Sequence, residues 1–144
     1  MLPGTIYVAS DHAGFILKEY LCLLLEEQGW KVENLGPESN DSTDYPDYAH
    51  KLCKKVLDTG HKGILVCGSG VGMSMAANRH KGIRAALCTH EFHAVTCRQH
   101  NDANVLCLGE RVTAPGLAAV LVELFLSTEF EGGRHQCRVE KIEV

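Results

Sequence analysis

The chain has 144 residues, 45% of them hydrophobic, and a formal net charge of −4. This length and composition suit one domain with a substantial core, so we expect residues 1–144 to form a single domain. The net negative charge argues against a nucleic-acid or membrane-binding surface, because such surfaces need an excess of Lys and Arg.

The cysteines and the apolar runs point to a cellular compartment. Seven cysteines include no C-x-x-C pair and lie mostly inside apolar runs, which favours free buried thiols in a reducing environment. The apolar start of the chain breaks at Asp11, too early for a signal peptide, and the run at 116–126 is too short to span a bilayer. We therefore expect a soluble, cytoplasmic protein with no membrane partner.

Strand-like and helix-like runs alternate along the chain. Short apolar runs predict strands at 5–9, 30–35, 62–67, 83–88 and 105–109. A helix is predicted after each strand, at 13–29, 46–60, 68–80, 90–100 and 114–126. Continuous apolar strands that alternate with helices are typical of a parallel sheet covered on both faces. The predicted fold is a three-layer α/β/α sandwich with a five-stranded parallel sheet, Rossmann-like in architecture.

Ligands of such sheets bind beyond the carboxyl ends of the strands. The residues expected at those ends are Asp11 and His12, Cys67, and Thr89 and His90. Asp11 could simply cap the helix that follows it. Capping does not account for His12, which makes this pair a candidate for holding substrate hydroxyls or a phosphate.

Three glycines follow Cys67 at positions 68, 70 and 72. They allow backbone amides at a helix N-terminus to point into one concavity, which can hold a phosphate or a developing oxyanion. A dinucleotide-binding fingerprint would need a glycine where Met73 stands, and the Gly-Lys-Ser/Thr ending of a P-loop is absent. A turn that merely permits close helix packing is the structural alternative. Cys67 is either a core thiol or, at the mouth of this loop, a base or nucleophile.

A histidine-rich segment precedes the fifth predicted strand. His90, His93, Cys97 and His100 lie along one face of a predicted helix. Four ligands spread over nearly three turns cannot converge on one ion, and HEFH is one residue short of the HExxH motif, so we expect no metal. His100, beside Asn101, is better suited to be a lone acid–base histidine.

The C-terminal tail, residues 127–144, is rich in cations for a net acidic chain. If it is helical, Arg134 and Arg138 share one face and could grip a phosphate with forked hydrogen bonds. A solvated basic patch is the alternative. We expect this segment to be a phosphate-binding tail of the domain.

Together these segments resemble the family of ribose-5-phosphate isomerase B and the lactose-operon galactose-6-phosphate isomerases. The resemblance covers essentially the whole chain, in the family's order and spacing. It is carried by SDHAGFILK, TDYPDYA, CGSGVGMSMAANR, GIRAALC, RQHNDANVLCLGER and EGGRHQCRV.

The resemblance implies an isomerase without metal or organic cofactor that interconverts an aldose phosphate and a ketose phosphate through a cis-enediolate. Cys67 would remove the proton beside the carbonyl, and Ser69 would relay protons. One branch of the family uses a glutamate where this chain has Met73, so the chain is similar to the cysteine branch. The amides that would stabilise the negative charge are those of Gly68, Gly70, Val71 and Gly72.

The remaining roles also come from the resemblance. His100 would open the sugar ring and Asn101 would hold a hydroxyl. The substrate-binding residues implied are Asp11, His12 and Tyr45 in the pocket, and Arg111, Arg134 and Arg138 at the phosphate. Similar proteins are homodimers or dimers of dimers, with each site completed across a subunit interface.

We expect the small-molecule substrates to be D-ribose 5-phosphate and D-ribulose 5-phosphate. The first alternative is a six-carbon phosphosugar isomerase acting on galactose 6-phosphate or allose 6-phosphate. The second is a phosphosugar-binding module without turnover, and a dinucleotide-binding protein is disfavoured by Met73. This chain carries Cys67, His100 and the arginines together, which favours a self-sufficient homo-oligomer.

Overall fold

The computed structural model describes residues 3–144, and five parallel strands form its centre. The strands are β1 (Thr5–Ser10), β2 (Lys31–Asn34), β3 (Gly63–Cys67), β4 (Ala85–Leu87) and β5 (Val105–Gly109). They lie in the order β2-β1-β3-β5-β4, and every neighbouring pair is parallel. The predicted five-stranded parallel sheet is confirmed.

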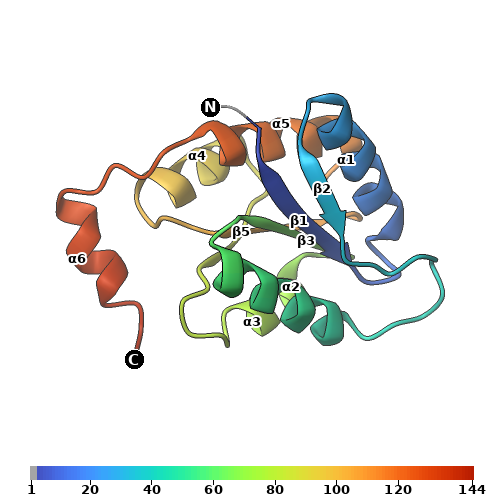
Figure 1. Ribbon diagram of the computed structural model, residues 1–144, viewed down its shortest axis with the longest axis horizontal. Coiled ribbons are helices and arrows are strands. Elements are labelled where there is room, and N and C mark those ends of the chain that lie inside the picture. Colours follow the sequence, from blue (N-terminus) through green and yellow to red (C-terminus); the bar gives the residue numbers. More distant parts are fainter. Residues whose placement is uncertain (1–2) are drawn as a thin grey trace.

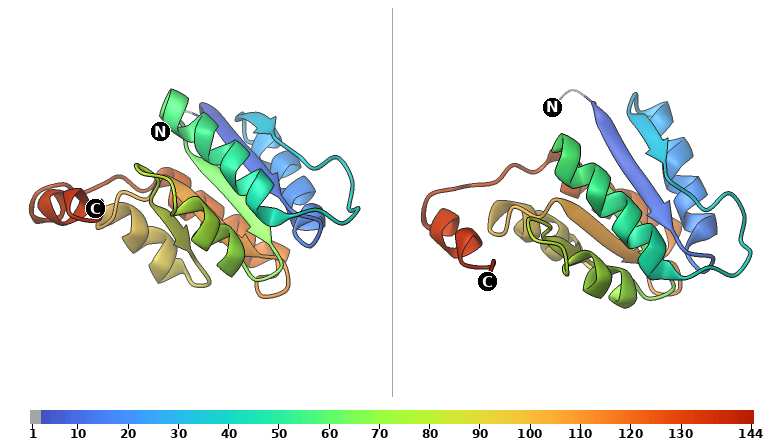
Figure 2. Two further views of the ribbon diagram at one scale, coloured as in Figure 1. Left: turned by 90° about the horizontal axis from the view of Figure 1, so that it is seen from below. Right: turned by 60° about the horizontal axis from the view of Figure 1, so that its bottom comes forward.

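Five helices cover the sheet and a sixth stands apart (Figures 1 and 2). The helices are α1 (Phe15–Glu27), α2 (Tyr45–Thr59), α3 (Val71–Ala77), α4 (Glu91–Gln99), α5 (Pro115–Ser127) and α6 (Arg134–Glu140). The third helix is shorter than the predicted 68–80, because Gly70 adopts a left-handed conformation with φ of 81° and α3 begins only after it. Among the described residues, no helix combines the length and the apolar character that a bilayer crossing requires.

Alternate strand residues point to opposite faces, so the sheet separates two cores. Ile64 and Val66 of β3 pack in the core beneath α1, α4 and α5. Leu65 and Cys67 of the same strand pack in the core beneath α2 and α3. This alternation places the Cys67 side chain on the α2 and α3 face, at the last position of β3.

The order of the strands creates a switch point between β1 and β3. The chain leaves β1 toward β2 on one side and later returns to β3 on the other side. Connections that depart in opposite directions leave a crevice beyond the carboxyl ends of the two strands, where ligands of open α/β sheets bind. The segment after β1 and the segment after β3 therefore meet at one place.

Candidate active site

A pocket of about 350 Å³ opens at this switch point. Its walls come from the segments after β1, β3 and β5 and from the start of α2. The lining residues are Asp11, His12, Ala13, Tyr45, Cys67, Gly68, Ser69, Gly72, Arg111 and Val112. Eight of the residues predicted from the sequence therefore lie in one pocket, although the segments that carry them are far apart in the chain.

Cys67 lies at the floor of this pocket. Its residue is 5% exposed, and its sulfur accepts a hydrogen bond from the Gly70 amide at 3.1 Å. The strand register pairs Cys67 with Gly109 of β5, so the sulfur is positioned by the sheet rather than by a mobile loop. A thiol with a fixed backbone donor at the wall of a pocket is placed to exchange a proton with a ligand.

The glycine loop is held by its own hydrogen bonds. The Gly70 amide donates to Cys67 Sγ, and the Val71 amide donates to Ser69 Oγ at 3.2 Å. A side chain at Gly72 would come within 2.7 Å of the Tyr45 ring. Glycine is required there because the ring of a pocket residue packs directly on the loop.

The residues after β1 serve both the fold and the pocket. Asp11 accepts a hydrogen bond from the Gly14 amide at 3.0 Å and so closes the turn before α1, whereas the N-cap of that helix is Gly14 and no side chain caps it. His12 exchanges two hydrogen bonds with Thr43: its Nδ1 accepts from the Thr43 amide and its own amide donates to Thr43 Oγ1, both at 3.1 Å. The Nδ1 atom is thereby engaged, which leaves Nε2 for a ligand.

Arg111 follows β5 and closes the pocket. Its guanidinium lies over Gly68, at 3.4 Å from where a side chain would begin, and its amide donates to the Gly68 carbonyl at 3.0 Å. The neighbouring Glu110 accepts a hydrogen bond from the Leu17 amide at 2.7 Å and so ties this loop to the first turn of α1. Arg111 supplies a cation to the pocket, beside the glycine loop.

Sequence reasoning did not single out Thr43 or Glu110. Both lie inside segments that had been singled out, TDYPDYA and the GER end of the fifth strand segment. Their roles are contacts across 31 and 93 residues of chain. Spacing along the sequence carries no signal for such contacts.

A second group of predicted residues lies at the other end of the sheet. His100 ends α4 and precedes β5, whereas Cys67 pairs with the last residue of β5. The five residues of β5 separate them, a span on the order of 13 Å. Arg134 and Arg138 lie on α6, which stands away from the sandwich in every view (Figures 1 and 2). One chain therefore does not bring His100 and these arginines to the Cys67 pocket.

The turn that carries His100 and Asn101 is firmly anchored. The Arg98 side chain, 5% exposed, donates to the Asp102 carboxylate at 2.8 Å and to the Ala103 carbonyl at 2.6 Å. Its Nε donates to the Thr128 carbonyl at 3.1 Å, beyond the end of α5. These bonds fix the end of α4, so His100 is presented from a rigid position.

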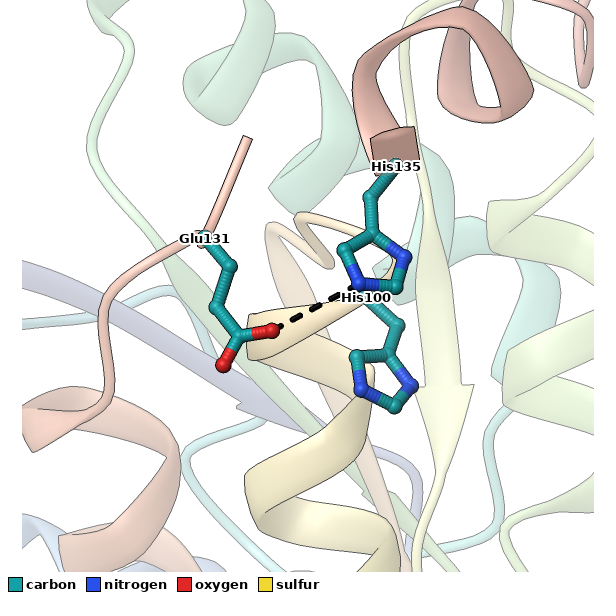
Figure 3. A group of neighbouring side chains, drawn as sticks. All are labelled: His100, Glu131 and His135. Carbon is teal, nitrogen blue, oxygen red and sulfur yellow. Dashed lines mark ion pairs between the residues drawn. The ribbon is translucent and has the colours of Figure 1, made fainter. Parts of the chain in front are cut away.

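His100 stacks on His135 of α6, and Glu131 completes the group (Figure 3). The ring centroids are 4.4 Å apart at an angle of 12°, and His135 Nε2 lies 3.5 Å from the Glu131 carboxylate. Burial lowers the pKa of His135, and the nearby His100 and Arg134 lower that pKa further. The stacking contact, together with the hydrogen bond from the Glu131 amide to the Gln99 carbonyl at 3.1 Å, links α6 and the segment before it to the end of α4.

The ligand atoms of His100, Glu131 and His135 lie within 4.8 Å of one another, which makes the group a candidate metal site. The lone pair of an imidazole lies in the plane of its ring, so two nearly parallel rings direct their lone pairs side by side rather than at a common point. In this arrangement His100 and His135 form an aromatic stack with Glu131 beside it, not a converging ligand set.

The chain is similar to a known family of enzymes over nearly its whole length. A sequence model of the family described as Ribose/Galactose Isomerase matches residues 6–142. Ribose-5-phosphate isomerase B of Escherichia coli is 47% identical over 138 residues, which cover 95% of this chain and 93% of that protein.

Solved structures agree with this match. A ribose 5-phosphate isomerase from Thermotoga maritima superposes with a TM-score of 0.95 at 49% identity, covering 96% of this chain and 97% of that one. Ribose-5-phosphate isomerase B from Mycoplasma genitalium, solved with bound ribulose-5-phosphate, has a TM-score of 0.94 at 43% identity, covering 99% and 95%. Since the family match spans nearly the whole chain and these similarities exceed 40% identity, the chain belongs to the ribose/galactose isomerase family.

Proposed function

We propose that the protein interconverts D-ribose 5-phosphate and D-ribulose 5-phosphate by proton transfer, without a metal or an organic cofactor. The observation that carries this proposal is the pocket at the switch point, where Cys67, the glycine loop and Arg111 meet. The similarity to ribose-5-phosphate isomerase B over 95% of the chain supports the choice of substrate.

In the proposed reaction the Cys67 sulfur, as a thiolate, takes the proton from C2 of the open-chain aldose. The electron pair of the broken C–H bond moves toward the carbonyl, and the resulting cis-enediolate carries negative charge on oxygen. Cys67 then returns a proton to C1, while a proton passes from O2 to O1 with help from Ser69. Atoms and charge balance, because one proton leaves C2 and one arrives at C1.

The glycine loop is suited to the charged intermediate. Backbone donors at the position where an oxyanion develops are each worth about 3 kcal/mol of barrier, because they need little reorganisation. Gly68, Ser69 and Gly72 line the pocket beside Cys67, and we assign the oxyanion to their amides, because the Gly70 and Val71 amides already donate to Cys67 Sγ and Ser69 Oγ. His12, Tyr45 and Arg111 line the rest of the pocket, where we place the sugar hydroxyls and the phosphate.

We further propose that a complete site needs two copies of the chain. His100 would open the furanose ring by proton transfer at the ring oxygen, with Asn101 on a hydroxyl, and Arg134 and Arg138 would hold the phosphate. These groups lie beyond the opposite end of the sheet from Cys67, on α4 and the extended α6. A homodimer in which residues 127–144 of one copy reach the pocket of the other would unite both sets.

The test is turnover of ribose 5-phosphate in deuterated water, followed by NMR. An isomerase forms ribulose 5-phosphate that carries deuterium at C1, and Cys67→Ala abolishes both product and label. Binding of the sugar phosphate without product or exchange would instead identify a sensor. Galactose 6-phosphate and allose 6-phosphate in parallel reactions decide between a five-carbon and a six-carbon substrate, since a higher kcat/KM for either would overturn the pentose assignment.

A further inference from the structure

Lys18 of α1 is fully buried, with an exposed fraction of 0%. Its ammonium donates to the Pro37 carbonyl at 2.7 Å, to Asn34 Oδ1 at 2.9 Å and to the Glu19 carboxylate at 3.0 Å. It also lies 4.9 Å from the centroid of the Phe15 ring. A lysine ammonium has three donors, and all three have acceptors here.

Two of these acceptors lie where β2 ends and the connection to α2 begins. Asn34 ends β2, and Pro37 lies in the irregular stretch that follows. Asn34 Oδ1 accepts a second hydrogen bond, from the Gly36 amide at 3.0 Å, and the Gly36 carbonyl accepts from the Ser10 amide at 3.1 Å. The ammonium therefore holds the beginning of this loop against α1 and the end of β1.

The far end of the same loop enters the pocket. Thr43 makes both hydrogen bonds to His12, and Tyr45 places its ring against Gly72. Residues 35–44 contain no helix or strand of their own. Their position must therefore come from contacts at the two ends. The Lys18 ammonium holds the first end, together with the backbone hydrogen bonds of Leu35 to Val8 and of Ser10 to Gly36.

A buried charge is a costly way to fill space. Moving an ammonium from water into the interior is unfavourable unless every donor is paired, and an apolar side chain of the same length avoids that cost. The ammonium instead provides directional hydrogen bonds. Two of them fix the Pro37 carbonyl and the Asn34 amide oxygen at defined points. This role explains why a fully buried position carries a lysine.

We propose that Lys18 is a positioning residue, whose buried ammonium fixes the loop from Asn34 to Asp44 and thereby orients His12 and Tyr45 in the pocket. The inference rests on the proposed function for its kinetic consequence, since His12 and Tyr45 are assigned there to the substrate. Lys18 itself lines no part of the pocket. Its effect should appear in substrate binding rather than in proton transfer at Cys67.

The main test compares Lys18→Met with Lys51→Met. Lys51 also donates to a carbonyl of this loop, that of Leu35 at 2.8 Å, but from an exposed position. We expect Lys18→Met to raise KM about tenfold and to change kcat less than about threefold, because misplaced binding groups weaken ground and transition states alike. Lys51→Met should leave both constants within about twofold of wild type, since exposed interactions contribute little.

A second measurement does not depend on turnover. Hydrogen exchange of the Thr43 amide, which is bonded to His12 Nδ1, should be faster in Lys18→Met and unchanged in Lys51→Met. A folded Lys18→Met protein with wild-type KM and wild-type Thr43 exchange would overturn the proposal. A wild-type protein without isomerase activity would reject the proposed function, while the exchange result would still decide the role of Lys18.

A double-mutant cycle separates positioning from general destabilisation. Thr43→Val removes the hydroxyl that accepts from the His12 amide, so it acts on the same histidine from the pocket side. If Lys18 acts through this contact, KM in the double variant rises by less than the product of the two single effects. A rise in the KM of the double variant equal to that product would overturn the proposal. If Lys18→Met does not fold, Asn34→Ala takes its place, because it removes one acceptor of the ammonium. The same results then support or overturn the proposal.

Discussion

Cys67 differs from the buried Cys22, Cys53 and Cys107 in what its sulfur faces. Burial raises the pKa of Cys22 and of Cys53 to about 12, and it raises the pKa of Cys107 as well. Those thiols stay protonated at neutral pH and serve as small apolar core residues. The Cys67 sulfur instead lies at a pocket wall with an amide donor at 3.1 Å. All four side chains are thiols, so the difference between them comes from their surroundings.

We expect Cys67→Ala to lower kcat by about 10²- to 10⁴-fold, the usual contribution of a positioned base. Affinity for a non-reacting sugar phosphate, measured by calorimetry, should change less than about threefold, because the base acts in the chemical step. Cys137→Ala is the control, since Cys137 is an exposed thiol on α6. Wild-type kcat in Cys67→Ala would show that another group is the base.

At the scale of elements, close contacts between strand ends and loops shape the pocket. A side chain at Gly109 would come within 2.5 Å of the Ser69 backbone, so the end of β5 and the loop after β3 touch directly. A side chain at Gly14 would likewise come within 2.5 Å of the Val66 carbonyl oxygen. These glycines allow three strand ends to come together tightly enough for one ligand to contact them all.

A pair of histidines joins α2 to the turn that follows α3. His50 Nδ1 and His80 Nε2 are 2.6 Å apart, and the rings meet edge to face. Burial lowers the pKa of His80, and the neighbouring His50 and Lys54 lower it further. One ring must donate and the other accept, so the contact requires that they are not both protonated.

This pair predicts a pH dependence of stability. Because the pKa of His80 in the folded protein lies below the ordinary value of 6.5, the unfolded chain binds the proton more readily. The stability that this pair contributes is therefore fully present above about pH 6.5, and it is lost as the pH falls below that value. His80→Gln, which offers an amide near the Nε2 position but does not titrate, should reduce this loss in urea unfolding between pH 5 and 8.

His93→Gln is the matched control for that measurement, because His93 is exposed on α4. Burial and nearby charges also lower the pKa of His135, so His80→Gln should flatten the profile in part rather than completely. An unchanged acid loss in His80→Gln would exclude the histidine pair as its source.

At the scale of the whole molecule, the candidate residues divide into two sets. The pocket set gathers at the switch point, and the second set gathers at the end of α4 and on α6 (Figure 1). The helix α6 is connected to α5 by residues 128–133, where Gly132 and Gly133 have positive φ values of 64° and 54°. This extended arrangement suits a segment whose partner is another copy of the chain.

Mixing two inactive variants tests that arrangement. If each site takes Cys67 from one copy and His100 from the other, Cys67→Ala and His100→Ala subunits form mixed dimers with one intact site. Random reassociation after mild unfolding should restore about a quarter of wild-type activity, since half of the dimers are mixed and half of their sites are intact. No recovery, with mixed dimers verified by native mass spectrometry, would show that both residues act in the same chain.

Much of this organisation follows from local sequence patterns. Apolar strand runs such as 62–67 and 105–109 predict buried parallel strands because both faces must be covered, and the sheet is confirmed. The same patterns place Asp11, Cys67 and the glycine loop at strand ends. The shared face of Arg134 and Arg138 depended on a helical tail, and α6 is that helix. Patterns of this kind are determined by residues close together in the chain.

The tertiary structure alone decided which strand ends are neighbours and what holds the pocket walls. The order β2-β1-β3-β5-β4 brings Asp11 to Cys67 and separates His100 from both. The hydrogen bonds of His12 with Thr43, Glu110 with Leu17 and Lys18 with Pro37 join segments with no shared periodicity. Sequence determines the local backbone geometry and the apolar faces, whereas such contacts exist only after the faces have packed, because packing sets the distances between segments.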